Sequence, residues 1–184
     1  KMKSADFEAG KLLEEAKETK TELANGTIVS FVPDKELFGN YHYILEYIEV
    51  LIKNYIYLNA GLTIVLNGVK YQSKNGLLDL LNENMDSEGL YPIIHLNNGD
   101  IDLAMTHGNQ YTDEYFPFVN GQHTTQGGTH QVAIKQAIVK TVREFYKKDF
   151  DPSDIRQSVI VALSIKIEEP VFESQTKTKL GSKD

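Results

Sequence analysis

The run SVIVALSIKI, residues 158–167, constrains the fold of this chain more than any other stretch. Aliphatic and β-branched residues dominate it, and Val161, Leu163, Ile165 and Ile167 alternate along its length. This composition and length are typical of a buried strand. A buried strand needs strands beside it and other elements packed over it, so the rest of the chain must supply both.

The segments that precede this run are predicted to supply them. Residues 91–96, 100–106 and 114–120 are predicted strands, and Pro117 in the third is suited only to an edge or a bulge. Residues 131–148 are a predicted helix, with an apolar face made of Ile134, Ala137, Ile138, Thr141, Val142 and Phe145. The order of three strands, a helix and a strand predicts an α+β fold, in which mixed sheets pack on helices.

A second helix and a hairpin are predicted earlier in the chain. Within residues 41–61, apolar side chains recur at intervals of four and three residues, as on one face of a helix. These side chains are Ile44, Ile48, Leu51, Tyr55 and Leu58, and Leu45 and Ile52 widen the stripe. Residues 62–71 are predicted as a hairpin, because Asn67-Gly68 is a pair that suits a two-residue turn.

The first part of the chain gives weaker signals. Residues 1–24 are rich in Lys and Glu and are predicted as a strand–turn segment or a loosely held edge. Residues 27–32 follow the turn pair Asn25-Gly26 and are predicted as a strand that Pro33 stops. The character changes after residue 72, where a short helix at 77–81 and a polar loop at 82–89 predict a boundary between two structural units.

Composition excludes several kinds of site. The 184 residues suffice for one large domain or two small ones, and the absence of cysteine excludes disulfides and thiolate metal sites. That absence fits a reducing cytoplasm without requiring it. No apolar run reaches the roughly 18–20 residues that span a bilayer, and residues 1–12 lack the apolar stretch of a signal peptide. The five histidines form no HxH or HxxxH pair, so a zinc site is not expected.

Three polar stretches compete as functional sites. The first is HTTQGGTH, residues 123–130, which leads into the helix at 131–148. Gly127 and Gly128 allow a close backbone approach, and Thr129 is predicted to cap the helix, which is compatible with an anion site. The pattern is neither a P-loop nor GxGxxG, and the favoured interpretation is a demanding strand-to-helix turn. His123 and His130 are then turn or cap partners rather than bases.

The second and third stretches are not equally well supported as functional sites. NENMD, residues 82–86, has the acids and amide of a magnesium site but no glycine-rich phosphate cradle beside it, which favours a solvated loop. The third, FESQTKTKLGSKD, residues 172–184, follows the buried strand. Gln175, Thr176 and Lys177 offer an amide, a hydroxyl and an ammonium to phosphate oxygens. On chemistry alone, a solvated basic tail containing Lys177, Lys179 and Lys183 remains the favoured alternative.

Longer motifs link these stretches to a known family. FPFVNGQHTTQGGTHQ and DIRQSVIVALSIKIEEPVFESQTKTKLGS closely resemble the B subunit of bacterial type II topoisomerases. NGTIVSFVPDKELF and NYIYLNAGLTIVLNG upstream resemble it in the same order. Of the two branches of the family, GQHTTQGGTH and EEPVFESQTKTKLGSKD are more similar to topoisomerase IV B than to gyrase B. Gyrase B, whose DxREGL pattern reads DIRQSV here, remains the alternative.

The resemblance implies an organisation and a set of site residues. Residues 1–74 would be the C-terminal part of a GHKL-type ATPase domain, and residues 75–184 the transducer domain. The transducer has a ribosomal-protein-like βαβ fold with a left-handed crossover, against the usual rule of handedness. In the family, a QTK loop reaches from the transducer to the γ-phosphate of ATP. The corresponding residues here are Lys177 and Gln175, with Thr176 between them.

The resemblance also implies what the chain would need for activity. The family uses ATP and Mg²⁺, but its catalytic glutamate and its magnesium- and adenine-binding residues lie in an earlier part of the ATPase domain. We therefore expect a fragment that is inactive alone and binds neither ATP nor Mg²⁺ tightly. The full-length enzyme would be cytoplasmic and nucleoid-associated, and would work with the topoisomerase IV A subunit and double-stranded DNA. Its B subunits would pair as a homodimer on ATP binding, and no membrane is involved.

Two interpretations from other classes remain open on the residues alone. One is a non-catalytic α+β module that binds nucleic acid through the basic helix 131–148 and the Lys177–Lys183 tail, which the net charge of −7 disfavours. The other is a small kinase-like enzyme, which is disfavoured because the chain has no phosphate-cradling motif.

Overall fold

The computed structural model describes residues 1–182 and divides into two compact units, the first spanning residues 1–45 and the second beginning at Glu46. Lys183 of the predicted basic tail therefore lies outside the described residues. The first unit contains two nested strand pairs and one turn of helix. Its elements are β1 (Met2–Ser4), β2 (Phe7–Glu8), β3 (Lys11–Leu12), β4 (Lys17–Thr19) and α1 (Lys35–Phe38).

Residues 1–24 form the predicted strand–turn segment, whereas the strand predicted at 27–32 is absent. Within the first unit β1 pairs with β4 and β2 pairs with β3, both antiparallel. Residues 27–32 have no regular structure, and Ile28 and Val32 are 81% and 88% exposed. The prediction was wrong because β-propensity reflects packing on a pleated surface, and within the described residues no strand pairs with this run. Among the same residues its one aromatic contact is the edge-on packing of Phe31 against Tyr43, with ring centres 6.5 Å apart.

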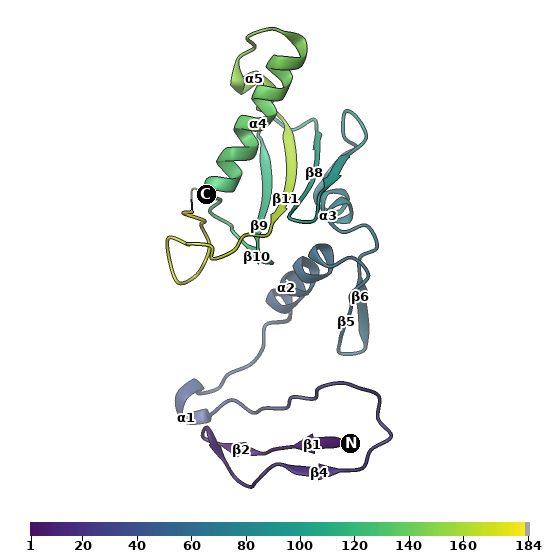
Figure 1. Ribbon diagram of the computed structural model, residues 1–184, viewed down its shortest axis with the longest axis vertical. Coiled ribbons are helices and arrows are strands. Elements are labelled where there is room, and N and C mark those ends of the chain that lie inside the picture. Colours follow the sequence, from purple (N-terminus) through teal and green to yellow (C-terminus); the bar gives the residue numbers. More distant parts are fainter. Residues whose placement is uncertain (183–184) are drawn as a thin grey trace. The chain divides into compact units, whose positions relative to one another are not determined.

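The second unit is built on a five-stranded sheet with the order β10-β9-β11-β8-β7 (Figure 1). The strands are β7 (Ile94–Asn97), β8 (Ile101–His107), β9 (Glu114–Val119), β10 (Gln122–His123) and β11 (Val159–Ile165). β11 runs parallel to β9 and antiparallel to β8, so it occupies the centre of the sheet. Pro117 lies beyond the two residues of β9 that pair with β10, which fits the predicted edge position.

The buried strand predicted at 158–167 is confirmed, and both of its faces are covered. Val159, Val161 and Leu163 contribute to one core cluster, and Ile160 and Ala162 contribute to the other. Full burial on two faces explains why this run is apolar at successive positions rather than at alternate ones.

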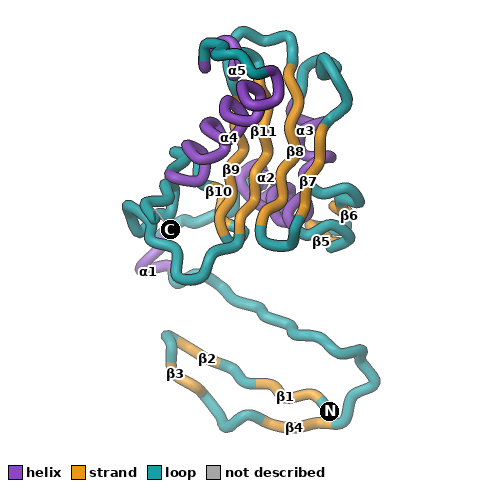
Figure 2. The backbone as a smooth tube through the Cα atoms, turned by 45° about the horizontal axis from the view of Figure 1, so that its top comes forward, coloured by secondary structure: helices purple, strands orange, loops and turns teal. Residues whose placement is uncertain are grey.

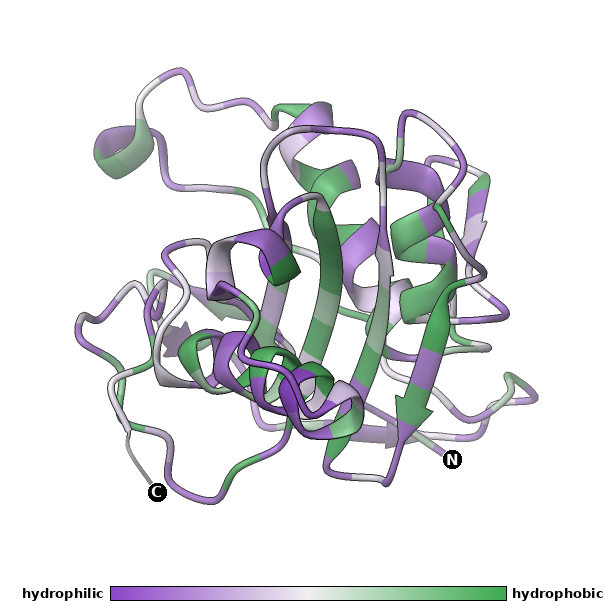
Figure 3. Ribbon diagram, turned by 90° about the horizontal axis from the view of Figure 1, so that it is seen from above, coloured by the Kyte–Doolittle hydropathy of each residue, from purple (hydrophilic) through white to green (hydrophobic). Residues whose placement is uncertain are grey.

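Helices form a layer on each side of the sheet. The helices are α2 (Leu45–Leu58), α3 (Leu77–Asn84), α4 (Thr129–Tyr146) and α5 (Pro152–Arg156). α2 and α3 pack in one core cluster, and α4 and α5 pack in the other. Figure 2 shows α4 in front of the strands and α2 behind them, and Figure 3 shows the hydrophobic residues along the strands. The predicted α+β class, with mixed sheets packed on helices, is confirmed, while the left-handed crossover of β9-α4-β11 stays a prediction.

Both long helices form where they were predicted, but their buried faces differ from the predicted ones. α2 buries Ile52, Ile56 and Tyr57, while Leu51 and Tyr55 of the predicted stripe are more than half exposed. α4 buries Ile138 and Val139, while Phe145 is 77% exposed. Since both sequences carry apolar residues on more than one side, periodicity alone could not select the side that meets the sheet.

The hairpin predicted at 62–71 is confirmed as β5 (Thr63–Leu66) and β6 (Val69–Gln72). Asn67 and Gly68 have φ of 50° and 85°, as a two-residue primed turn requires. By contrast, the polar loop predicted at 82–89 begins later, because residues 82–84 belong to the last turn of α3.

The predicted boundary near residue 74 is a tightly bonded joint between β6 and α3. The Asp79 carboxylate accepts hydrogen bonds from the Ser73 hydroxyl at 2.6 Å, from the backbone N–H groups of Lys74 and Asn75, and from the Asn75 side chain. α2, before the joint, shares a core cluster with α3, after it. The assignment of residues 1–74 and 75–184 to two domains stays a prediction.

The hydrogen bonds of the Asp79 carboxylate at this joint should make the stability of the protein depend on pH. Burial acts to raise the pKa of Asp79, but the bonds from Ser73, Asn75 and Lys74 outweigh it and hold the pKa below its ordinary value. The contribution of a carboxylate with a lowered pKa is present above its unfolded pKa and is lost as the pH falls through the folded one. We expect Asp79→Asn to lower the free energy of unfolding by about 1–2 kcal/mol at pH 7.

Chemical denaturation between pH 7 and pH 2.5 checks this expectation, and the difference from wild type should shrink below about pH 4. Asp86→Asn is the matched control, since Asp86 makes no hydrogen bond through its side chain within residues 1–182. A pH-independent difference for Asp79→Asn would show that the carboxylate charge is not what holds the joint.

Candidate functional site

The C-terminal residues form a hairpin rather than a solvated tail. In this C-terminal hairpin, residues 171–182, the Glu173 N–H donates to the Lys179 carbonyl at 3.0 Å and the Gly181 N–H donates to the Val171 carbonyl at 2.8 Å. The Lys179 ammonium also lies 2.9 Å from the Glu173 carboxylate. The two arms are thus joined by backbone hydrogen bonds and by an ion pair, and residues 174–178 form the tip of the hairpin.

The tip presents the three predicted site residues, Gln175, Thr176 and Lys177, to solvent. The Lys177 N–H donates to the Ser174 carbonyl at 3.0 Å, and Lys177 has a φ of 56°. A left-handed backbone is uncommon for a lysine, and here, as for Lys147 at the end of α4, it closes a turn of the chain. Within residues 1–182 the Lys177 ammonium makes no ion pair, and its nearest aromatic ring, Phe172, is centred 5.9 Å away.

The glycine loop, residues 124–130, lies against the base of this hairpin. The Gln126 N–H donates to the Thr178 carbonyl at 2.9 Å, the Leu180 N–H to the Gly127 carbonyl at 3.1 Å, and the Thr129 N–H to the Leu180 carbonyl at 3.2 Å. Leu180 itself is only 2% exposed. Two of the three competing stretches therefore form one site.

The close backbone approach predicted at the glycines occurs at Gly128, and its partner is the hairpin. A Cβ atom at Gly128 would lie 2.3 Å from the Leu180 carbonyl oxygen and 2.6 Å from the Leu180 nitrogen, and Gly128 has a φ of 136°. Only glycine fits such a position. The predicted cap was wrong: Gly128 is the N-cap of α4, and Thr129 is its first residue, with no side-chain cap bond. The Thr129 N–H is already bonded to Leu180, so this helix end binds protein backbone.

Of the two histidines of this stretch, His130 is buried and His123 is partly buried. The His130 Nε2 lies 3.0 Å from the Thr124 hydroxyl, and burial lowers the pKa of His130 to about 4. His123 stacks on Phe118 with ring centres 4.8 Å apart, and burial lowers its pKa as well. Both rings are neutral at physiological pH, as turn partners would be.

The NENMD stretch lies apart from this site and is already occupied by protein contacts. Glu83 in α3 accepts hydrogen bonds from Lys53 and Tyr57 of α2. Among the described residues, no group of three His, Cys, Asp or Glu side chains is placed to hold a metal ion. The same residues contain no helix that is long and apolar enough to cross a membrane.

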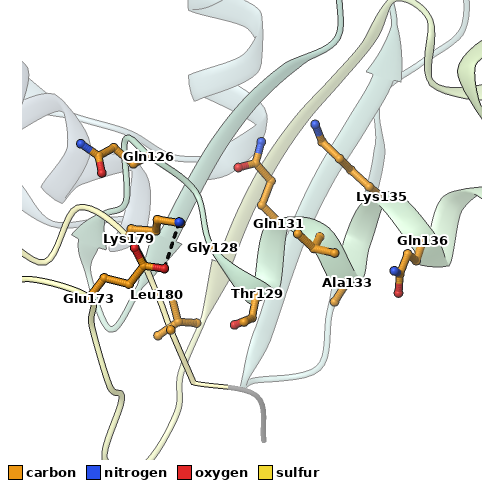
Figure 4. A pocket seen from close by; sticks show the side chains of 12 residues that line it. Gln126, Gly128, Thr129, Gln131, Ala133, Lys135, Gln136, Glu173, Lys179 and Leu180 are labelled. Carbon is orange, nitrogen blue, oxygen red and sulfur yellow. Dashed lines mark ion pairs between the residues drawn. The ribbon is translucent and has the colours of Figure 1, made fainter.

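A groove of about 570 Å³ runs between the C-terminal hairpin and the first turns of α4 (Figure 4). Its two lysines are already paired: Lys179 with Glu173, and Lys135 with Asp113 at 3.1 Å and with the Tyr115 ring at 4.3 Å. Among the lysines of the groove and of the C-terminal hairpin within residues 1–182, Lys177 at the tip is therefore the one without an ion pair.

The comparisons with known proteins agree with this architecture. The family model described as DNA gyrase B matches residues 44–184. This chain belongs to the DNA gyrase B family. It is 43% identical over 177 residues to the B subunit of DNA topoisomerase 4 from Borreliella burgdorferi, a match that covers 96% of this chain and 29% of that protein. It is 29% identical to the B subunit of DNA gyrase from Eisenibacter elegans, over 86% of this chain and 39% of that protein.

Solved structures place the fold in the same group. The 43K ATPase domain of Thermus thermophilus gyrase B matches with a TM-score of 0.66 and 25% identity, over 82% of this chain and 46% of that one. The topoisomerase IV ATP-binding domain of Francisella tularensis shares the fold, with a TM-score of 0.74 at 22% identity over 99% of this chain and 55% of that one. The resemblance to bacterial type II topoisomerase B subunits is thus confirmed, and the chain spans less than half of the length of the two curated relatives.

Proposed function

We propose that this chain is part of the ATPase subunit of an ATP-dependent type II DNA topoisomerase of the topoisomerase IV branch. Residues 1–74 then belong to the GHKL-type ATPase domain and residues 75–184 to the transducer. The observation that carries the proposal is the tip of the C-terminal hairpin, where Lys177 is exposed, unpaired within residues 1–182 and held in a left-handed conformation. The higher identity to a topoisomerase 4 protein than to a gyrase supports the branch.

In this proposal Lys177 senses the γ-phosphate of ATP. Its ammonium complements phosphate oxygens, and such charge-assisted hydrogen bonds are stronger than neutral ones. Gln175 adds an amide and Thr176 a hydroxyl from the same tip. ATP, when bound, supplies the phosphate whose presence or loss distinguishes two orientations of the transducer. The hairpin residues fit the phosphate end of a nucleotide, whereas no described cluster of carboxylates fits Mg²⁺.

The proposal extends to the full-length enzyme. The family's catalytic glutamate and its magnesium-binding asparagine have no counterpart in these 184 residues, so the chain alone should neither bind ATP tightly nor hydrolyse it. The full-length protein would use ATP with Mg²⁺, pair as a homodimer on ATP binding, and act with the A subunit on double-stranded DNA. Its place would be the cytoplasm, at the nucleoid.

A separate nucleic-acid-binding module finds less support in the contacts of α4. Lys135 pairs with Asp113, Lys140 lies near Glu144, and Arg143 pairs with Asp149. Cations that are already paired contribute less to the release of counterions on which such binding depends.

Reconstitution of the full-length protein with its A subunit tests the proposal. We expect relaxation or decatenation of closed-circular DNA that requires hydrolysable ATP and Mg²⁺. Under the same conditions the 184-residue chain, assayed alone, should show no ATP turnover above background. Activity of the full-length pair without nucleotide, or no effect on DNA topology with it, would contradict the proposal.

A further inference from the structure

We propose that the glycine loop, residues 124–130, is the seat that fixes the position of Lys177, and that His130 is the positioning residue that holds this seat. The inference rests on the proposed function, because it assigns to Lys177 a role that needs a defined position. It assigns to the GGTH stretch a role in holding the sensor, without contact to any ligand.

The seat begins at Thr124, which is fully buried. Its N–H and its hydroxyl both donate to the Pro117 carbonyl, at 2.9 and 3.0 Å. Since the single hydroxyl hydrogen is used there, the Thr124 oxygen accepts from the His130 Nε2–H at 3.0 Å. The Gly127 N–H in turn donates to the Thr124 carbonyl at 2.7 Å, so the hydroxyl and the turn of the loop are fixed together.

His130 is suited to this role by its surroundings. It is 6% exposed, and its Nδ1 has no hydrogen-bond partner within the described residues, so Nε2 makes the ring's one hydrogen bond there. Burial keeps the ring neutral near pH 7, so the Nε2–H donor stays in place. The buried Nδ1 without a partner costs free energy of folding, so the Nε2 hydrogen bond is the polar contact by which this ring acts on the loop.

Backbone contacts connect the seat to the tip of the hairpin and so fix where the tip lies. Three hydrogen bonds join residues 126–129 to residues 178–180, and Gly128 approaches Leu180 too closely for any other residue. Lys177 lies one residue before Thr178, at the end of this bonded segment. His130 is also in the first turn of α4. Therefore a shift of Lys177 on loss of a phosphate would be passed to α4 through the seat.

Two substitutions at His130 separate its hydrogen bond from its bulk. His130→Gln keeps an amide N–H near the position of Nε2, whereas His130→Leu keeps an apolar volume without a donor. In the full-length protein without nucleotide, we expect the amide hydrogens of Gln126, Thr129 and Leu180 to exchange about tenfold faster in His130→Leu. In His130→Gln they should exchange within about threefold of wild type. Thr124→Val removes the hydroxyl that accepts from His130 and keeps the shape of the side chain. It should accelerate exchange as His130→Leu does, and it replaces His130→Leu in the experiment if the leucine variant folds poorly.

Measuring ATP turnover of the same variants tests whether the seat positions Lys177. We expect His130→Leu to lower turnover about tenfold and His130→Gln to restore most of it. Wild-type exchange in both His130→Leu and Thr124→Val would overturn the seat, as would equal acceleration in His130→Gln and His130→Leu. Accelerated exchange with unchanged turnover would overturn the positioning of Lys177.

The Lys177→Ala variant distinguishes this inference from the proposed function. It should leave the exchange of the three amides unchanged while lowering turnover. Wild-type turnover in Lys177→Ala would refute the sensing role of Lys177, whereas the exchange measurements at His130 would still decide whether the seat exists.

Discussion

Replacing Lys177 by alanine in the full-length protein is expected to lower ATP turnover about 10- to 100-fold, because a hydrogen bond between charged groups contributes about 1.5–3 kcal/mol. The fold should be unaffected, since the side chain is exposed and makes no ion pair within residues 1–182. Steady-state ATPase assays measure the first effect and thermal unfolding the second. DNA relaxation should fall in parallel, because the same contact is proposed to couple the nucleotide to the transducer.

The hairpin contains a matched control for this change. Lys179 lies two residues along the hairpin, but its ammonium is paired with Glu173 at 2.9 Å and lines the groove rather than the tip. Lys179→Ala should therefore change turnover less than about threefold, as expected for a partly exposed ion pair. Equal losses in the two variants would indicate a general effect of positive charge, and wild-type turnover in Lys177→Ala would remove the assignment.

Replacing Gly128 by alanine should have an effect of similar size by a different route. The new Cβ would lie 2.3 Å from the Leu180 carbonyl oxygen, and alanine is strained at a φ of 136°. The hairpin must then move away, which breaks backbone bonds and exposes Leu180. Exposure of a buried leucine costs about 1.5–3 kcal/mol, so we expect a loss of about 2–3 kcal/mol in the free energy of unfolding.

The consequence for activity follows from the displaced tip. Gly128→Ala should lower ATP turnover of the full-length protein about as much as Lys177→Ala, although Gly128 lies far from the tip in sequence. Gly181→Ala is the matched control, because its Cβ would meet the Val171 carbonyl oxygen at an ordinary 3.5 Å. Denaturant unfolding and ATPase assays decide the outcome. A Gly128→Ala protein with normal stability and turnover would show that the close approach to Leu180 is dispensable.

Local signals in the sequence predicted most elements of the second unit. The apolar run at 158–167, the Asn67-Gly68 turn and the glycines before α4 each have one strong physical meaning, and each was confirmed. The strand predicted at 27–32 was wrong, because a β-branched run needs a partner to become a strand.

The site was predicted only in part. Lys177, Gln175 and Thr176 do share an exposed tip, as expected for a loop after a rigid strand. The sequence could not show that residues 124–130 hold this tip, because the two segments are about fifty residues apart and meet through backbone atoms. The signal available in the sequence was Gly128 itself. A glycine at a close backbone approach implies a partner, but the sequence alone does not identify that partner.

The central claim is that Lys177 recognises the γ-phosphate, and nucleotide discrimination tests it most directly. The measurement is the ratio of the Kd for ADP to the Kd for a non-hydrolysable ATP analogue, determined by calorimetry on the full-length protein with and without Lys177→Ala. We predict that the wild-type protein binds the analogue more tightly, and that Lys177→Ala reduces the ratio about tenfold or more by weakening the analogue alone. An unchanged ratio, or equal weakening of both nucleotides, would contradict the claim.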